Sequence, residues 1–229
     1  MASPILSKPP MELTDIKAIL QHPDSQERLK GIVALKEYEP EVAGPLLLSR
    51  KDDPEFLVRS FVAMGLGRKR SDQGYATLKT MIAHDPDANV QAEACNSLAM
   101  YGEAAVPCLV ETFHRSGHWL VRRSILAAMI DLNHPAAMLE ICLAALADSD
   151  LTVINAGIDH LGILHDAEEA DAALDAILAH KSADSWYTRM HVAYALKKFD
   201  QEAARAALIE LRQDPHHKVV AAALEGLLP

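Results

Sequence analysis

Few residues in this chain have the types and spacings that catalysis requires. Its 229 residues contain no HExxH, CxxC, nucleophile-elbow or phosphate-loop motif. His114 and His118 stand on either side of an expected helix break at Ser116-Gly117, so they do not form a metal-binding pair. The three cysteines fall in apolar helical segments, which predicts buried thiols rather than nucleophiles or a disulfide: Cys95, Cys108 and Cys142. The sequence predicts no metal site, and it leaves any acid–base assignment open.

A repeated pattern organises the residues around these positions. Val121, Ile125, Leu126 and Met129 place apolar side chains on one face of a helix. The same pattern recurs at intervals of about 31 to 35 residues, with anchors at Glu27, Val58, Val90, Val153, Thr188 and Val219. This period is typical of stacked helical hairpins, so we expect an all-α fold, an α-α superhelix of about seven hairpins.

Each anchor lies on the second helix of a hairpin, and a candidate first helix precedes it. These first helices are expected at Glu12–Gln21, Pro40–Ser49, Gly74–His84, Glu103–Phe113, Pro135–Ala147, Glu168–His180 and Gln201–Gln213. Asp-Pro pairs such as Asp53-Pro54, Asp85-Pro86 and Asp214-Pro215 separate the two helices of several copies. Because Asp caps helix N-termini and Pro fits the next position, we expect these aspartates to cap the second helices.

The composition limits the class of protein. Half of the residues are apolar and 5% are aromatic, which suits helix packing better than a sheet. A net charge of −10 at pH 7 argues against nucleic acid as a partner, and no apolar run is long enough to span a membrane. We expect a flexible tail at 1–11 and a single solenoid domain at 12–229, in a soluble, cytoplasmic protein.

The candidate binding surface is a stripe on the second helices, on the face away from the core positions. In hairpin solenoids these helices line the concave side, and residues four apart on them are neighbours. Both tryptophans take equivalent places on this stripe, and exposed aromatics with Met and Arg are typical of binding hot spots. The candidates are Phe56, Met64, Trp119, Arg123, Asn155, Asp159, Trp186, Met190 and Tyr194, with Tyr187 and His191 beside them.

Some of these residues have a structural alternative. Trp119 and Trp186 stand at helix starts, where they could instead fill the junctions between neighbouring hairpins. Arg59, Arg122 and Arg189 follow their anchors directly and are expected to pair with inter-helix aspartates, although Arg122 and Arg189 remain binding candidates.

His160 occupies a position that is small in the other copies, namely Ala34, Gly65, Ser97, Ala128, Ala195 and Gly226. A bulky, titratable group there costs packing. It either points outward through a local shift or is present for a functional reason.

Several segments carry a resemblance to a known family. They are Asp85-Pro86-Asp87 with Val90-Gln91-Ala92, Trp119-Leu120-Val121-Arg122 with Ser124-Ile125, Leu161-Gly162, Trp186 with Arg189, and Ala195-Leu196. The chain resembles the phycobilisome-lyase-type HEAT-repeat family, and within it the cyanobacterial phycobilisome-degradation proteins of the NblB type. The resemblance runs from Thr14 to Leu228. It departs from the pattern at Ile154, where Arg is expected, and at Asn133-His134, where a turn glycine is usual.

The resemblance implies an interaction with phycobiliprotein subunits or with their linear tetrapyrrole chromophore, phycocyanobilin, as a non-covalent ligand. Lyases of this family attach or remove a bilin at a cysteine, and the degradation type is linked to chromophore detachment. On this basis the implied roles fall on the stripe. Arg122 or Arg123 would hold a propionate, Trp119, Trp186, Tyr187 and Tyr194 would stack on the rings, Asp159 would accept pyrrole N–H bonds, and His160 or His191 would move a proton.

Two other functions compete with chromophore detachment. The chain would attach a bilin as a lyase subunit, or it would act as a non-catalytic scaffold, for example for iron–sulfur assembly. A detaching enzyme needs a titratable cluster near the aromatic groove, and Asp159, His160 and His191 are its candidate catalytic residues. The C-terminal end, Leu227-Leu228-Pro229, lacks a polar cap, which predicts possible self-association there.

Overall fold

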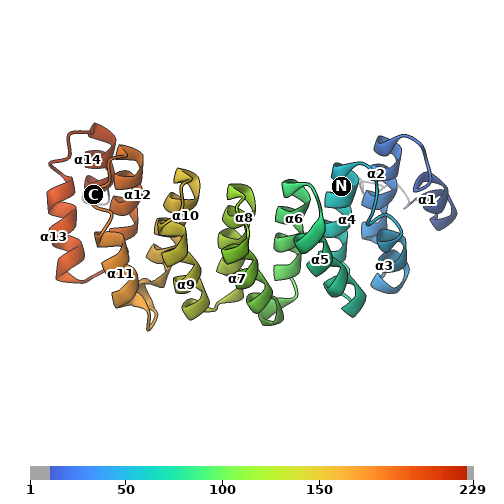
Figure 1. Ribbon diagram of the computed structural model, residues 1–229, viewed down its shortest axis with the longest axis horizontal. Helices are drawn as coiled ribbons and strands as arrows, with labels where there is room; N and C mark the ends of the chain where they lie inside the picture. Colours follow the sequence, from blue (N-terminus) through green and yellow to red (C-terminus); the bar gives the residue numbers. More distant parts are fainter. Residues whose placement is uncertain (1–10, 226–229) are drawn as a thin grey trace, which may run out of the picture. The chain divides into compact units, whose positions relative to one another are not determined.

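The computed structural model describes residues 11–225, and the regular structure in that range is entirely helical (Figure 1). The chain divides into two compact units, residues 1–105 and 106–229. Unit 1 contains α1 (Leu13–Ile19), α2 (Ser25–Ala34), η1 (Leu35–Glu37), α3 (Pro40–Leu48), α4 (Phe56–Arg68), α5 (Asp72–His84), α6 (Ala88–Ala99) and η2 (Gly102–Ala105). Unit 2 contains α7 (Val106–Arg115), α8 (Trp119–Met129), η3 (Ile130–Leu132), α9 (Pro135–Leu146), α10 (Leu151–Leu161), η4 (Gly162–Asp166), α11 (Ala170–Leu178), α12 (Trp186–Leu196), α13 (Glu202–Leu211) and α14 (His217–Leu224).

Helical hairpins stack in each unit, with first helices in one layer and second helices in another. In unit 1, α4 packs against α2 and α6, and α3 packs against α5. In unit 2, α10 packs between α8 and α12, and α12 also contacts α14. Each unit is therefore a short α-solenoid, as the repeat pattern predicts, and the expected first helices agree with the observed ones to within a few residues. Among residues 11–225, no helix is both long enough and apolar enough to cross a membrane.

The predicted core positions form the interior of both units. Val121, Ile125, Leu126 and Met129 are at most 1% exposed, and the equivalent residues of the second, third, fifth and sixth copies are buried in the same way. In the last copy the pattern is incomplete, since Leu224 is 41% exposed. The repeating apolar face thus packs each second helix against its own hairpin and its neighbours. Residues 1–10 of the predicted tail at 1–11 lie outside the described part of the chain, as do the predicted self-association residues Leu227, Leu228 and Pro229.

Arginine–aspartate pairs connect successive hairpins. Arg59 holds Asp85 of the next hairpin through two hydrogen bonds, of 2.7 and 3.0 Å. The same guanidinium also donates to the carbonyl oxygen of Asp53, 2.8 Å away in the preceding inter-helix turn. Equivalent pairs are Arg28–Asp53, Arg122–Asp148 and Arg189–Asp214. The expectation that these arginines pair with inter-helix aspartates is confirmed.

These aspartates do not cap the second helices, contrary to the sequence-based expectation. At α6 and α10 the residue two positions later does so: Asp87 caps α6 and Asp150 caps α10. Asp85 instead accepts a bond from the backbone N–H of Asp87, as Asp148 does from Asp150, and each turns its carboxylate toward an arginine. In these two turns one aspartate caps the helix and the other binds the arginine of the neighbouring hairpin.

Candidate functional site

The candidate residues of unit 2 lie on the adjacent second helices α8, α10 and α12. Trp119, Arg122 and Arg123 belong to α8, Asn155, Asp159 and His160 to α10, and the remainder to α12. Trp119, Tyr187 and Tyr194 are 43%, 45% and 40% exposed, which is high for aromatic side chains. We call Trp119, Arg123, Asp159, Tyr187 and Tyr194 the aromatic surface.

Asp159 and His191 form the central contact of this surface. The Nδ1 atom of His191 lies 2.7 Å from Oδ1 of Asp159, so the pair joins α10 to α12. The Tyr187 ring meets the His191 ring edge to face at 4.6 Å. The Asp159 side chain is 45% exposed, whereas that of His191 is 17% exposed and its Nε2 is buried without a hydrogen-bond partner in the described chain. The pair therefore offers a carboxylate to the surface and keeps the imidazole beneath it.

His160 is more enclosed than its neighbour Asp159. Its Nδ1 contacts the carbonyl oxygen of Ala156, and its Nε2 is buried with no hydrogen-bond partner among residues 11–225. Burial lowers the pKa of His160 below its usual value; the positive charges of Lys198 and Arg123 act in the same direction, and Ala156 and Asp159 oppose them. His160 is thus held neutral near pH 7, and it does not point outward as a free acid or base.

The two equivalent tryptophans have different surroundings. Trp186 stacks on His216 of the next hairpin at 4.1 Å, with the rings only 7° from parallel. It therefore fills a junction, which was the structural alternative for this residue. Trp119 stacks loosely on the preceding His118 at 6.1 Å and stays exposed.

Two lysines near these rings were not among the residues singled out from sequence. Lys197 lies 4.6 Å above the Tyr194 ring, and Lys218 lies 5.1 Å from the Trp186 ring. Burial raises the pKa of Tyr194, and the carboxylate of Glu225 adds to the rise. Lys197 follows Tyr194 by three residues, whereas Lys218 comes from the hairpin after that of Trp186. Only the first spacing is readable as a helix-face neighbour.

The prediction that Asn155 lies on the exposed stripe of the second helices is wrong. It is only 3% exposed, because α10 packs against α8 on one side and α12 on the other. Neither its amide nitrogen nor its amide oxygen has a hydrogen-bond partner within the described residues. A helix wheel treats this position as outward, but the neighbouring second helices cover it.

Arg122 and Arg189 are engaged in the clamps between hairpins. Arg189 holds Asp214 with bonds of 2.6 and 3.0 Å and also donates to the carbonyl oxygen of Ala183. Arg122 pairs with Asp148 and lies 5.6 Å from the Phe113 ring. Arg123 differs, since it is exposed and forms no hydrogen bond or ion pair with another described residue. Arg123 is accordingly an exposed cation of α8 that no other described residue neutralises.

The remaining candidates do not join this group. Phe56 and Met64 lie on α4 in unit 1, 39% exposed and half-buried respectively. Met190 lies on α12 and is half-buried.

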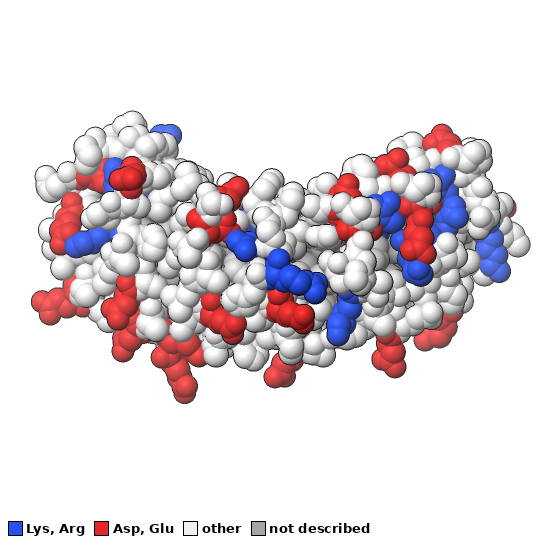
Figure 2. Space-filling view, viewed as in Figure 1, with Lys and Arg blue, Asp and Glu red and all other residues white. Residues whose placement is uncertain are grey.

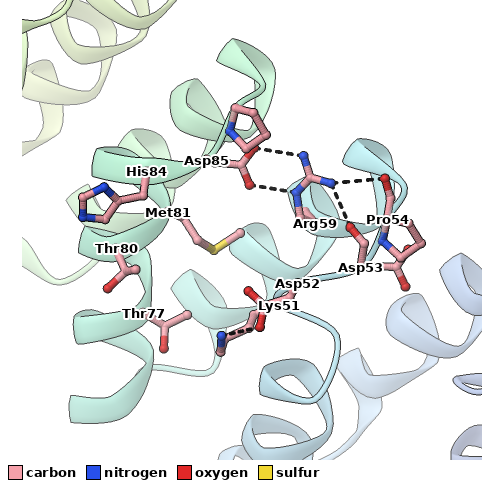
Figure 3. Close-up of a pocket in the computed structure, with 11 residues that line it drawn as sticks. Lys51, Asp52, Asp53, Pro54, Arg59, Thr77, Thr80, Met81, His84 and Asp85 are labelled. Atoms are coloured by element: carbon pink, nitrogen blue, oxygen red, sulfur yellow. Dashed lines mark hydrogen bonds and ion pairs between the residues drawn. The ribbon is translucent and has the colours of Figure 1, made fainter.

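A cavity of about 470 Å³ opens beside the inter-helix turns of unit 1 (Figure 3). The Arg59–Asp85 pair and Asp53 line it, with His84 at one end. A cavity of about 440 Å³ takes the equivalent place in unit 2, beside Arg189 and Asp214. Because the same clamp lines both, these recesses are products of the repeat.

Neither a metal site nor a reactive cysteine finds support among residues 11–225. No three His, Cys, Asp or Glu side chains there come together in a way that could hold a metal ion. Cys142 is buried, and burial raises the pKa of its thiol well above the usual value. On the face drawn in Figure 2, acidic side chains are spread along both units, with Lys and Arg between them.

Residues 44–130 match the family model described as HEAT repeats. Together with the stacked hairpins, this match defines the class of protein: an all-α protein built of HEAT-type repeats. No curated protein sequence matches the chain significantly.

Solved structures with the same fold include YibA of Escherichia coli, at 17% identity and a TM-score of 0.67, over 93% of this chain and 80% of that one. The complex of CpcE and CpcF of phycocyanin lyase from Nostoc sp. PCC7120 is also similar, at 18% identity and a TM-score of 0.55, over 100% of this chain and 91% of that one. At these identities the likeness concerns the fold alone.

Proposed function

We propose that this protein binds a phycobiliprotein or its linear tetrapyrrole on the aromatic surface, in support of chromophore detachment of the NblB type. The observation that carries the proposal is the grouping of exposed Tyr187 and Tyr194 with the Asp159 carboxylate and the exposed cation Arg123. A bilin has flat conjugated rings, pyrrole N–H groups and two propionates. Aromatic faces, a carboxylate and a guanidinium are complementary to these three features.

The similarity to the phycocyanin lyase subunits CpcE and CpcF supports this class of partner through a shared fold. A lyase subunit that attaches the bilin is therefore the second candidate, followed by a scaffold without chemistry of its own.

The surroundings of the histidines favour binding over catalysis. His160 and His191 each use Nδ1 in a contact and bury Nε2, so neither ring offers a nitrogen to a ligand on the surface. General acid–base catalysis needs such a nitrogen within hydrogen-bond reach of the substrate. We accordingly assign Asp159 and Arg123 to ligand binding and give no catalytic role to the histidines.

The test combines the purified chain with phycocyanin and, separately, with free phycocyanobilin. Co-elution in gel filtration and the absorbance of the bilin report binding. The paired change Tyr187→Leu and Tyr194→Leu should weaken binding by about tenfold, because aromatic contacts contribute about 0.5–1.5 kcal/mol each beyond their area. Ile209→Ala, which alters an exposed apolar residue on α13 in the other helix layer, is the control.

The outcomes separate the candidates. Loss of covalent bilin absorbance from phycocyanin would indicate detachment, and colour gained by the apoprotein would indicate attachment. Binding to phycocyanin that ignores both tyrosine changes would argue for a scaffold with a different contact surface. No binding to either partner would remove the proposal.

A further inference from the structure

A second cavity opens in unit 1 between α2, η1 and α4, and it contains none of the residues of the aromatic surface. Its volume is about 370 Å³, within the range of small-ligand sites. Its lining combines an apolar part that includes Val33, Leu47, Phe61 and Met64, here called the wall, with the three cations Lys36, Arg68 and Lys69, here called the mouth.

The apolar wall includes side chains that the core leaves uncovered. Val33 is 44% exposed on α2, and Phe61 and Met64 on α4 are half-buried. Beneath them, Leu47 is 1% exposed and belongs to the packed interior. An apolar group that enters the cavity would therefore cover exposed apolar surface, which is favourable in proportion to the area removed from water.

The cations at the mouth differ in how they are engaged. Lys69 donates from Nζ to the carbonyl oxygen of Lys36 at 2.8 Å, which ties the end of α4 to η1 and holds the rim in place. Lys36 itself is 3.4 Å from Glu37 and largely exposed. Arg68 is exposed and has no hydrogen bond or ion pair to any of residues 11–225, although its charge acts on Glu93. In a chain of net charge −10, this mouth presents a positive charge that no neighbour neutralises directly.

We propose that this cavity binds a small amphiphilic carboxylate, with its apolar part against Phe61 and Met64 and its carboxylate at Arg68. A neutral apolar ligand would leave the guanidinium without a partner, and a small inorganic anion would leave the apolar wall uncovered. A carboxylate gives the guanidinium the geometry of acceptor that it binds best, because two parallel N–H···O bonds can form. This site is independent of the bilin proposal, since it involves another unit and another class of ligand.

Octanoate and its neutral analogue 1-octanol are the probes. Isothermal titration calorimetry on the full chain should give tighter binding for octanoate than for 1-octanol. Arg68→Gln should weaken octanoate by about tenfold or more, the loss typical of a hydrogen bond to a charged group, and should leave 1-octanol unchanged. Arg205→Gln removes an exposed arginine of unit 2, side chain 68% exposed, and serves as the matched control.

Two further measurements locate the site. With methyl-¹³C methionine, octanoate should shift the Met64 signal and leave that of Met190 in place. Val33→Glu, at a wall position that is 44% exposed, should abolish octanoate binding by placing a negative charge inside the cavity. An unmoved Met64 signal at saturating octanoate, equal affinity for octanoate and 1-octanol, or wild-type affinity in Arg68→Gln would each overturn the proposal.

Discussion

At the scale of single residues, the clamp between Arg189 and Asp214 is the best-defined electrostatic contact of unit 2. The hydrogen bond from Arg189 lowers the pKa of the Asp214 carboxyl; burial opposes this, and the backbone N–H of His216 adds to the lowering. The Asp214 bond in turn raises the pKa of Arg189. The Asp214 side chain is only 5% exposed, so water stabilises its charge little. The carboxylate and the Arg189 guanidinium therefore stabilise each other's charge.

Asp214→Asn should therefore destabilise the protein at pH 7 by about 1–3 kcal/mol, because Arg189 is left partly buried without its counter-ion. The folded-state pKa of Asp214 lies below the unfolded value of about 3.9, so its stabilisation is complete above that value and is lost as the pH falls through the folded pKa. Urea unfolding should show a gap between wild type and variant at pH 7 that narrows below about pH 4.

The exposed Asp200, whose side chain lies 3.9 Å from Arg205, provides the control. Asp200→Asn should change the free energy of unfolding little at either pH. A gap for Asp214→Asn that persists unchanged in acid would contradict the role of the charged pair.

At the scale of elements, the close approach of neighbouring second helices depends on small residues. Gly67 on α4 faces α6, and a Cβ built there would lie 2.9 Å from both Cα and the carbonyl oxygen of Ser97. Those are backbone atoms, which cannot move aside as a flexible side chain can. The spacing of α4 and α6 thus requires glycine at this position.

Gly67→Ala should lower the free energy of unfolding by about 1–3 kcal/mol, since overpacking forces the two helices apart. Gly44 on α3 is the matched control, because a Cβ there meets nothing within 4 Å. Gly44→Ala should stabilise the protein by about 0.5–1 kcal/mol, as alanine does relative to glycine inside a helix. Equal effects of the two changes in chemical denaturation would show that packing between α4 and α6 does not limit residue 67.

At the scale of the whole molecule, the net charge can be calculated directly from the sequence. The net charge of −10 at pH 7 comes from 32 acidic and 22 basic residues. Backbone binding to nucleic acid depends on clustered cations, so the long-range field of this protein opposes it.

We expect no retardation of duplex DNA by this protein in an electrophoretic mobility assay at about 0.15 M salt, where basic proteins bind without sequence preference at roughly 10⁻⁴–10⁻⁶ M. A complex that weakens steeply as salt rises would contradict this expectation and point to a local basic surface that outweighs the net charge.

The stripe of candidate residues shows how far sequence reasoning reaches into the site. Trp119, Tyr187 and Tyr194 are exposed as the helix-face pattern predicts, and Asp159 contacts His191 across two helices. The pattern misplaces Asn155, because a helix wheel contains no information about the neighbouring helices on either side. The cavity between α2, η1 and α4 could not be predicted from the sequence either, because its mouth brings together residues more than thirty positions apart, such as Lys36 and Lys69.

The sequence by itself determined the helical hairpins, their period, the buried face of each second helix and the arginine–aspartate pairing, because all of these follow from residue spacing within a helix or between equivalent turns. Only the tertiary structure decided which outward positions stay open. It buried Asn155, enclosed the rings of His160 and His191 and stacked Trp186 on His216. It also left Arg68 and Arg123 exposed, with no ion pair or hydrogen bond to the other residues of 11–225. Solvent exposure and partner atoms depend on the packing between hairpins, which helical periodicity does not encode.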